Sequence, residues 1–101
     1  EMELGVVIGN GGANISINDA AQQIAGVCLT LDLTARDVQA EAKAKGLPWT
    51  IAKGYDTFCP ISAYLPRAGF MDPMNLEMEL RVNGHLKQRV NTGEMIFNVY
   101  E

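Results

Sequence analysis

Residues 27–34 read "VCLTLDLT", and this stretch decides the fold class. Apolar and polar side chains alternate along it without a break. Successive strand residues point to opposite faces, so the pattern predicts a strand with one face toward the core and one polar face. The residues expected on the core face are Val27, Leu29, Leu31 and Leu33. Asp32 is the one charged residue on the polar face.

A helix is predicted on each side of this strand. Residues 34–46 read "TARDVQAEAKAKG", in which Thr34 is a suitable N-cap and Gly46 a suitable stop. Upstream, "SINDAAQQIAG" predicts a second helix over residues 17–25, ended by Gly26. The strand therefore lies between two helical segments.

The remaining chain is rich in strands and turns. We expect strands at 2–9 and 61–66, an irregular stretch at 47–60, a hairpin over 76–90 and the start of a helix after Asn91. The predicted fold class is α+β, strand-rich, within a single domain.

The hairpin turns at Asn83 and Gly84, and its register follows from its two faces. A strict two-residue turn would set charged residues against the apolar face. A three-residue loop over 82–84, with Gly84 at positive φ, makes both faces consistent. The pairs expected are Leu80 with Leu86, Leu76 with Val90, Glu79 with Lys87, and Glu77 with Arg89.

The bulk composition excludes some classes of partner. The 101 residues carry a net charge of -4, which argues against nucleic acid or an anionic membrane as a partner. No apolar run reaches the 18 or so residues that a membrane span needs. With Cys28 and Cys59 as the only cysteines, a reduced, intracellular protein is the default expectation.

Three carboxylates are candidate metal ligands. Glu1 and Glu3 project from the same face of the first strand, where like charges repel unless a cation lies between them. Asp32 is the natural third ligand for a hard cation such as Mg²⁺. The plainer alternatives stay open on spacing alone: a solvated strand face for the glutamates, and a capping acid at a strand end for Asp32.

Three polar side chains are candidates for substrate contact. Arg36 and Gln39 share one face at the start of a helix, whose partial positive charge suits an anion. A surface pairing of Arg36 with Asp37 or Glu41 is the alternative. Lys53, in the long irregular stretch, could stabilise developing enolate charge or be a solvated loop lysine.

The histidine and the two cysteines are expected to have structural rather than catalytic roles. His85, the only histidine, follows the hairpin glycine and lacks an obvious partner, which argues against Ser-His-Asp and Cys-His chemistry. Cys28 and Cys59 are expected to be packing residues rather than nucleophiles. Three aromatic residues of the irregular stretch could pack it down or form a pocket wall: Trp49, Tyr55 and Phe58.

Several blocks together resemble the fumarylacetoacetate hydrolase superfamily, in particular its small acylpyruvase and oxaloacetate decarboxylase-like branch. They occur in the family's order and spacing and span nearly the whole chain. The blocks are "EMELGVVIG", "LTLDLTARDVQ", "GLPWTIAKGYDTFCP", "VNGHLKQ" and "NTGEMIF".

The resemblance implies a function and a site. It implies a metal-dependent hydrolase or lyase that cleaves a C–C bond of a 2-oxo acid, by acylpyruvate hydrolysis or oxaloacetate decarboxylation, through an enolate stabilised by the metal. The metal, Mg²⁺ or Mn²⁺, would be held by Glu1, Glu3 and Asp32. Arg36, Gln39 and Lys53 would face the substrate, with Lys53 at the developing negative charge. A keto-enol or double-bond isomerase with the same site, and a piece that only binds metal or assists assembly, are the alternatives.

The resemblance also implies an incomplete domain. The expected fold is a mixed β-sandwich-like roll, of which residues 1–101 would be the central part. The family's N-terminal lid, with its His and Glu, and a C-terminal glycine- and threonine-rich segment have no counterpart in these residues. A homodimer, a need for the remainder of the domain, and a location in the cytoplasm, or in the mitochondrial matrix if the source is eukaryotic, are further expectations.

Overall fold

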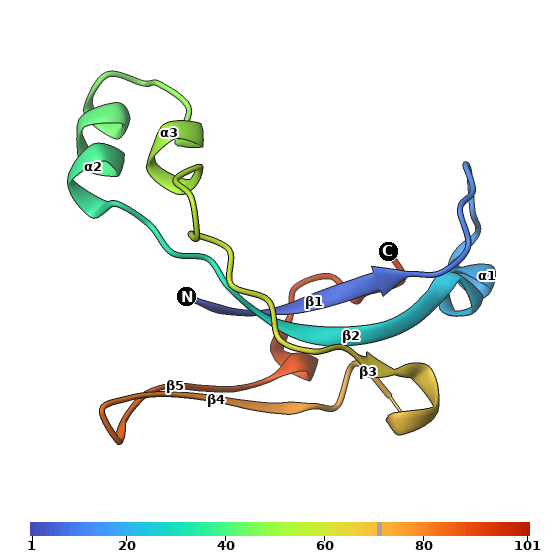
Figure 1. The fold of residues 1–101 in the computed structure, drawn as a ribbon. Coiled ribbons are helices and arrows are strands. Elements are labelled where there is room, and N and C mark those ends of the chain that lie inside the picture. The colour runs from blue at the N-terminus through green and yellow to red at the C-terminus, as the bar shows by residue number, and fades with distance from the viewer. Residues whose placement is uncertain (71) are drawn as a thin grey trace.

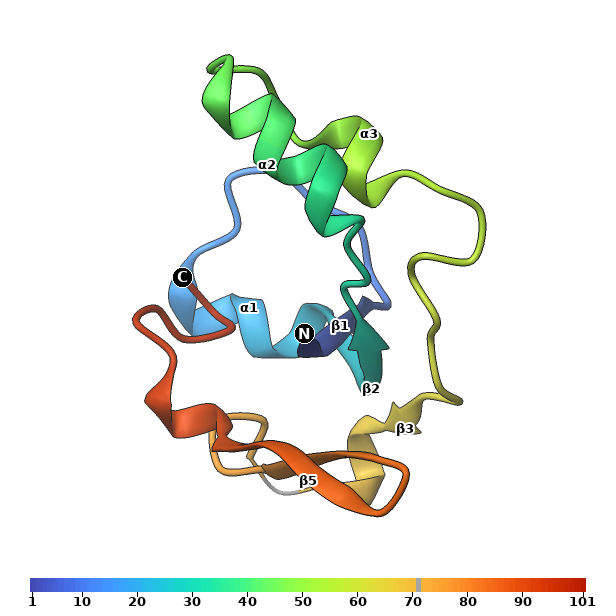
Figure 2. The same cartoon turned by 90° about the vertical axis from the view of Figure 1, so that its left-hand side faces the viewer.

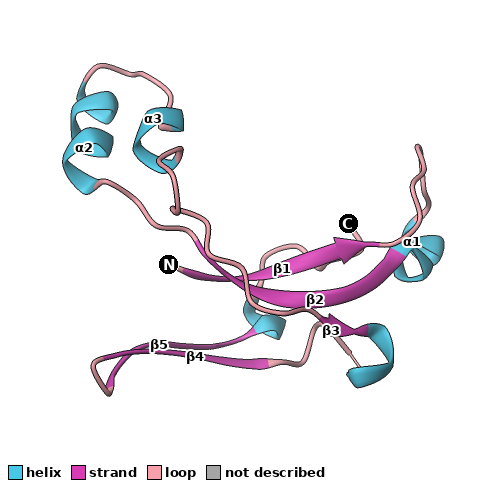
Figure 3. Cartoon of the chain, in the orientation of Figure 1, coloured by secondary structure: helices cyan, strands magenta, loops and turns pink. Residues whose placement is uncertain are grey.

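A computed structural model describes residues 1–70 and 72–101 as two antiparallel sheets with short helices at their margins (Figures 1 and 3). The first sheet has the strand order β1-β2-β3 and the second is the hairpin β4-β5. The strands are β1 (Met2–Ile8), β2 (Ile24–Leu31), β3 (Leu65–Pro66), β4 (Glu77–Val82) and β5 (His85–Asn91). The helices are α1 (Ile17–Gln23), α2 (Arg36–Ala44) and α3 (Thr50–Lys53), with 3-10 turns η1 (Arg67–Gly69) and η2 (Thr92–Glu94). The predicted α+β, strand-rich class is confirmed.

The alternating segment forms the central strand of the first sheet, β2, which begins and ends three residues earlier than predicted. Leu29 and Leu33, which were expected on the core face, are exposed, so that part of the prediction is wrong. The strand begins at Ile24, so α1 ends before the expected stop at Gly26. The reason lies in the neighbouring strand: a Cβ at Gly26 would stand 2.4 Å from the Leu65 carbonyl oxygen. Gly26 therefore permits the close approach of β3 rather than ending a helix.

The helix after β2 ends where predicted but begins differently. Gly46 has φ +65° and closes α2, and the amide of Leu47 donates to the Ala42 carbonyl over 2.9 Å. The N-cap is Ala35, so the expected capping role of Thr34 is wrong. The Ala35 amide instead donates to the carbonyl of Ala52 over 2.9 Å, which ties the start of α2 to α3.

The segment 47–60, expected to be irregular throughout, contains the single-turn helix α3. Ala52 in this turn is 1% exposed, and its carbonyl accepts from the Ala35 amide, which ties the turn to the start of α2. In Figure 2, α2 and α3 lie at one end of the molecule and the hairpin at the other. Lys53 consequently projects from a helix and not from a loop.

The predicted strand over 61–66 is present only at its end. Residues 65–66 form β3, and Ile61 makes an isolated bridge with Thr30. Between these points the chain still follows β2, since the amide of Leu31 donates to the Pro60 carbonyl over 3.1 Å and the amide of Ser62 to the Leu29 carbonyl over 3.0 Å.

The hairpin has its irregularity in a different place from the one predicted. Its turn has two residues, Asn83 and Gly84, with φ of 51° and 79°, values typical of a type I′ turn whose twist suits the strands. Lys87 is the extra residue, because Arg81 pairs with Leu86 while Leu80 pairs with Gln88. The bulge thus lies in β5.

The four predicted cross-strand pairs are therefore wrong in register. Met78 stands opposite Val90, Glu79 opposite Arg89, and Glu77 opposite Asn91. Arg89 still lies 3.5 Å from the Glu77 carboxylate, across the diagonal of the ladder.

The chain after the hairpin turns once and does not continue as a helix. Asn91 and Glu94 form the reciprocal capping box expected from the sequence, but the turn they begin, η2, ends at Met95. Thr92, 2% exposed, secures this turn: its hydroxyl accepts from the Leu76 amide over 2.9 Å.

A small core forms between the two sheets. Met2, Val27 and Met78 are each at most 9% exposed, so one residue from each of β1, β2 and β4 shares the small core. The two sheets are also joined by the Gln88 side chain, which hydrogen-bonds the backbone of Met2. The core therefore forms directly beneath the N-terminal end of β1.

Candidate metal centre

The pairing of β1 with β2 brings the three predicted ligands together. Met2 lies opposite Leu31 in the ladder, which sets Glu1 opposite Asp32. The Asp32 amide donates to the Glu1 carbonyl over 2.8 Å, and the backbone nitrogen of Glu1 donates to the Asp32 carbonyl over 3.2 Å. Glu3 stands opposite Thr30. One carboxylate oxygen from each of Glu1, Glu3 and Asp32 lies within 4.8 Å of the others.

This spacing fits a divalent cation. Oxygens that bind Mg²⁺ at about 2.1 Å stand about 3 Å apart when adjacent and about 4.2 Å apart when opposite. The upper limit of 4.8 Å between the three carboxylate oxygens is close to these distances. The two glutamates are exposed and Asp32 is half-buried, so one side of the cluster is open to water or a second ligand. Three carboxylates are the donor set that a hard cation prefers.

Lys53 supplies a positive charge next to this cluster. Its ammonium group forms an ion pair with the Asp32 carboxylate, and the two side chains are 32% and 22% exposed. The same ammonium donates to the Thr34 hydroxyl over 3.4 Å. One lysine leaves the three carboxylates with an excess of negative charge, which a bound divalent cation would neutralise.

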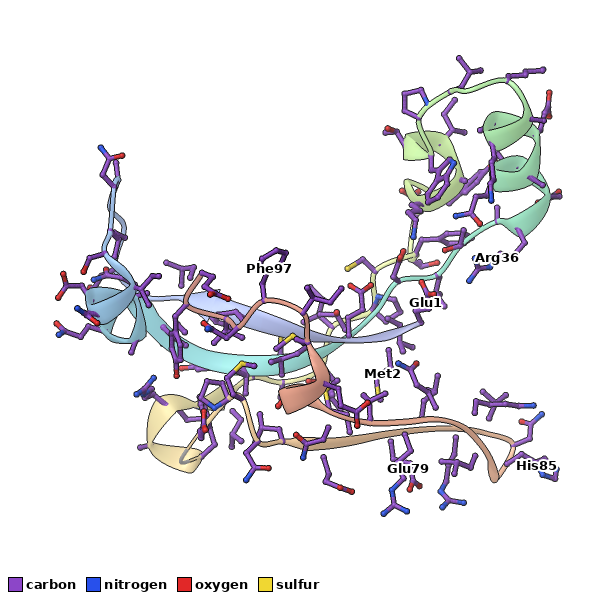
Figure 4. All side chains as sticks on the ribbon, turned by 180° about the vertical axis from the view of Figure 1, so that it is seen from behind. Glu1, Met2, Arg36, Glu79, His85 and Phe97 are labelled. Atoms are coloured by element: carbon purple, nitrogen blue, oxygen red, sulfur yellow. The ribbon has the colours of Figure 1, made fainter. Side chains whose placement is uncertain are left out.

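Arg36 and Gln39 share a face of α2, as predicted. The Arg36 guanidinium donates to the Gln39 side-chain oxygen over 3.0 Å, and Arg36 is exposed. The alternative pairing of Arg36 with Glu41 is not formed, because Glu41 accepts from Lys45 over 2.6 Å. Figure 4 shows Arg36 where β2 leads into α2, at the same end of the molecule as Glu1. Arg36 and Gln39 therefore contact each other, and neither side chain is hydrogen-bonded to the three carboxylates.

The other candidate residues lie away from the carboxylates or have structural contacts. His85 is exposed at the tip of the hairpin (Figure 4). Cys28 and Cys59 are both free thiols; Cys28 is half-buried, but Cys59 is exposed, so the expected packing role is wrong for Cys59. The rings of Tyr55 and Phe58 contact each other with centroids 5.2 Å apart, so these two aromatic residues help to pack the segment after α3.

Sequence reasoning missed two residues around the cluster. The hydroxyl of Thr34, which was assigned as a helix cap, accepts a hydrogen bond from the Lys53 ammonium. Gln88 reaches the backbone between the two glutamates. Thr34 lies on the polar face with Asp32, and that alternation was the available signal. Nothing local in the sequence indicates that Gln88 reaches β1, because the contact joins residues 86 positions apart.

Comparison with known proteins identifies the family of the chain. The family model "Fumarylacetoacetate (FAA) hydrolase C-terminal" matches residues 1–101. The chain belongs to this family.

Curated relatives cover almost all of the chain. It is 50% identical over 99 residues to the mitochondrial oxaloacetate decarboxylase of Dictyostelium discoideum and 48% identical over 99 residues to the mitochondrial oxaloacetate tautomerase FAHD1 of Mus musculus. Each match covers 98% of the chain and 45% of the relative, so the chain spans about half the length of these proteins.

A solved relative shares the fold. Fumarylpyruvate hydrolase from Pseudomonas aeruginosa, crystallised in complex with Mn²⁺ and pyruvate, matches with a TM-score of 0.92 and 34% identity, over 100% of the chain and 43% of that protein. This likeness supports the expected family fold. None of the helices in residues 1–70 and 72–101 combines the length and apolar character needed to cross a membrane.

Proposed function

We propose that this protein is a metal-dependent enzyme that cleaves a C–C bond of a 2-oxo acid, by decarboxylation of oxaloacetate or hydrolysis of an acylpyruvate. The observation that carries the proposal is the cluster of Glu1, Glu3 and Asp32 with Lys53 paired to it. A 2-oxo acid offers a carboxylate and a keto oxygen to such a site. A bound Mg²⁺ or Mn²⁺ would supply Lewis-acid chemistry there.

Each site residue has a role that its position allows. Glu1, Glu3 and Asp32 would hold the cation. Lys53, whose ammonium is already beside Asp32, would place positive charge against the enolate oxygen that develops when the bond breaks. Arg36 and Gln39, exposed at the start of α2, would orient the far carboxylate or oxygen of the substrate.

The identity of the cation is part of the proposal. Carboxylate oxygens suit Mg²⁺ and Mn²⁺ alike, so the donor set favours both over softer metals. The fumarylpyruvate hydrolase neighbour, which was crystallised in complex with Mn²⁺ and pyruvate, supports a divalent cation and a 2-oxo acid as ligands. A homodimer and a mitochondrial location, the latter printed in the names of the curated relatives, remain proposals for this protein.

A second candidate function is oxaloacetate tautomerisation. It is favoured by the relative from Mus musculus, which is named a tautomerase. Tautomerisation also passes through an enolate, in this case that of oxaloacetate itself, but it breaks no C–C bond. The cluster and Lys53 would therefore serve both reactions, and product analysis distinguishes them.

The deciding experiment uses the complete gene product with Mg²⁺ or Mn²⁺. Oxaloacetate and acetylpyruvate are supplied separately, and pyruvate release is measured alongside the rate at which enol converts to keto form. Release of pyruvate supports decarboxylation or hydrolysis. Faster enol-to-keto conversion without pyruvate supports the tautomerase. If neither substrate changes while metal is bound, the enzymatic proposal fails.

Asp32→Asn tests the metal site itself. It should weaken Mn²⁺ affinity by more than about 100-fold, because a ligand contributes more than the outer-shell groups whose loss costs 10- to 100-fold. Asp37→Asn, which removes an exposed acid from the first turn of α2, is the matched control and should bind Mn²⁺ normally. Equal affinity in wild type and Asp32→Asn would overturn the site.

A further inference from the structure

The backbone of Met2, between the two glutamates, faces away from β2. Its neighbours Glu1 and Glu3 stand opposite Asp32 and Thr30, and Glu1 exchanges both backbone hydrogen bonds with Asp32. In an antiparallel ladder such pairs alternate with pairs that share no hydrogen bond, so the N–H and C=O of Met2 point outward from the edge of the sheet. Met2 is 4% exposed, and unpaired polar groups there would be costly.

Gln88 satisfies both of these groups. Its side-chain oxygen accepts from the Met2 amide over 2.9 Å, and its side-chain nitrogen donates to the Met2 carbonyl over 3.1 Å. The side-chain amide of Gln88 thus makes the two hydrogen bonds that the backbone of a neighbouring strand would otherwise make. A glutamate would keep the acceptor but lose the donor, and a methionine of similar length would lose both.

The bulge in β5 places Gln88 for this contact. If the two-residue turn were followed by a regular ladder in which Lys87 paired with Leu80, Gln88 would stand opposite Glu79, on the outward face of the hairpin. With the bulge, Gln88 stands opposite Leu80, on the same face as Met78, which is buried against the first sheet. Bulges commonly redirect a side chain in this way next to functional sites.

We infer that Gln88 is a positioning residue of the metal centre. Side-chain direction in a strand follows the pleat of the backbone, so the orientation of Met2 sets the directions in which Glu1 and Glu3 leave the strand. By clamping both polar groups of Met2, Gln88 fixes the angle between the two carboxylates. This role rests on the proposed metal site and adds to it a residue from the other sheet.

The test compares Mn²⁺ affinity with stability in the complete gene product. Gln88→Met should weaken Mn²⁺ binding about tenfold, in the range for groups that orient metal ligands. Its bound Mn²⁺ should also give a broader EPR spectrum, since the carboxylates are less well ordered. The measurement is made where circular dichroism shows the variant to be fully folded, so that unfolding does not contribute. Arg89→Gln, on the outward face of the same strand, is the matched control and should keep wild-type affinity.

Gln88→Glu provides a second variant of nearly the same shape, for the case in which Gln88→Met does not fold. Its carboxylate faces the Met2 carbonyl without a proton to donate, so it should weaken Mn²⁺ binding as well. An Mn²⁺ dissociation constant within twofold of the wild-type value, in whichever of the two variants is folded, would overturn the positioning role. Failure of both variants to fold would also overturn it, because Gln88 would then be a residue that stabilises the core. Absence of Mn²⁺ binding in the wild type would instead overturn the proposed metal centre.

Discussion

At the scale of single residues, Lys53 places a positive charge beside the proposed metal ligands. Its ammonium pairs with one of the three carboxylates and also reaches the Thr34 hydroxyl. A cation bound by the cluster would compete with the lysine for Asp32. The lysine would then be released toward the open side, where substrate would bind.

Lys53→Met should separate metal binding from turnover. Removal of a competing positive charge should leave Mn²⁺ affinity unchanged or tighter, while turnover should fall by about 100-fold or more, as on loss of a charge-stabilising group. Lys45→Met, which removes an exposed lysine paired with Glu41, is the control and should be active. Full activity in Lys53→Met would remove this lysine from the proposed chemistry.

The residue types at the cluster could be predicted because strand alternation puts Glu1 and Glu3 on one face and Asp32 on the polar face of its own strand. Their mutual distance could not be predicted, since it depends on the register of β1 against β2. The contact between Lys53 and Asp32 could not be predicted from the sequence either. It requires the turn of α3, whose signal is one buried alanine between Pro48 and Gly54.

At the scale of elements, the contact between β2 and β3 depends on a missing side chain. Gly26→Ala would place a methyl group 2.4 Å from the Leu65 carbonyl oxygen, so one strand must shift. We expect a loss of about 1–3 kcal/mol in the free energy of unfolding, the usual cost of overpacking. Urea denaturation measures it.

Gly11→Ala is the matched control for this change. A Cβ at Gly11 has nothing within 4 Å, so the free energy of unfolding should change by less than about 0.5 kcal/mol. Equal effects of the two substitutions would contradict the close approach of β3.

Deletion of Lys87 tests the register of the hairpin. The residue has no partner on β4, so its loss leaves Leu80 opposite Gln88 and should preserve Mn²⁺ affinity. In the register expected from the sequence, the same deletion would move Gln88 to the outward face and weaken binding. Deletion of Arg89, which has Glu79 as its partner, should instead destabilise the hairpin.

The hairpin also illustrates what a local pattern leaves undetermined. Asn83-Gly84 correctly indicated the turn, and the alternation correctly indicated that one irregular residue was needed. The pattern did not specify where that residue lies: the bulge at Lys87 sets Val90 opposite Met78 but also sets Leu86 opposite Arg81, which apolar alternation alone would not predict. Packing against Met2 in the other sheet distinguishes this register from the predicted one.

At the scale of the whole molecule, residues 1–101 form an open structure. The radius of gyration is 15.9 Å, whereas a compact domain of 100 residues has about 13 Å. Ile96 is 93% exposed and Phe97 72% exposed, next to each other after η2. Apolar surface of this kind is usually covered by another surface.

Ile96→Asp tests for such cover in the complete gene product. If another segment or a second copy covers Ile96, the charge should lower the free energy of unfolding by about 2 kcal/mol or shift a dimer to monomer, seen by urea denaturation and analytical ultracentrifugation. Glu101→Lys, a charge change at an exposed position, is the control. If both variants match the wild type, Ile96 is solvated in the working protein.

The ladder between β1 and β2 has a consequence for how this centre can change over evolution. Glu1 and Asp32 are joined by two backbone hydrogen bonds, although 31 positions separate them. The loop and α1 between the strands contribute no ligand to the cluster. Insertions, deletions or whole new segments in that connection would therefore leave the carboxylates in place. Relatives could diversify there without rebuilding their chemistry.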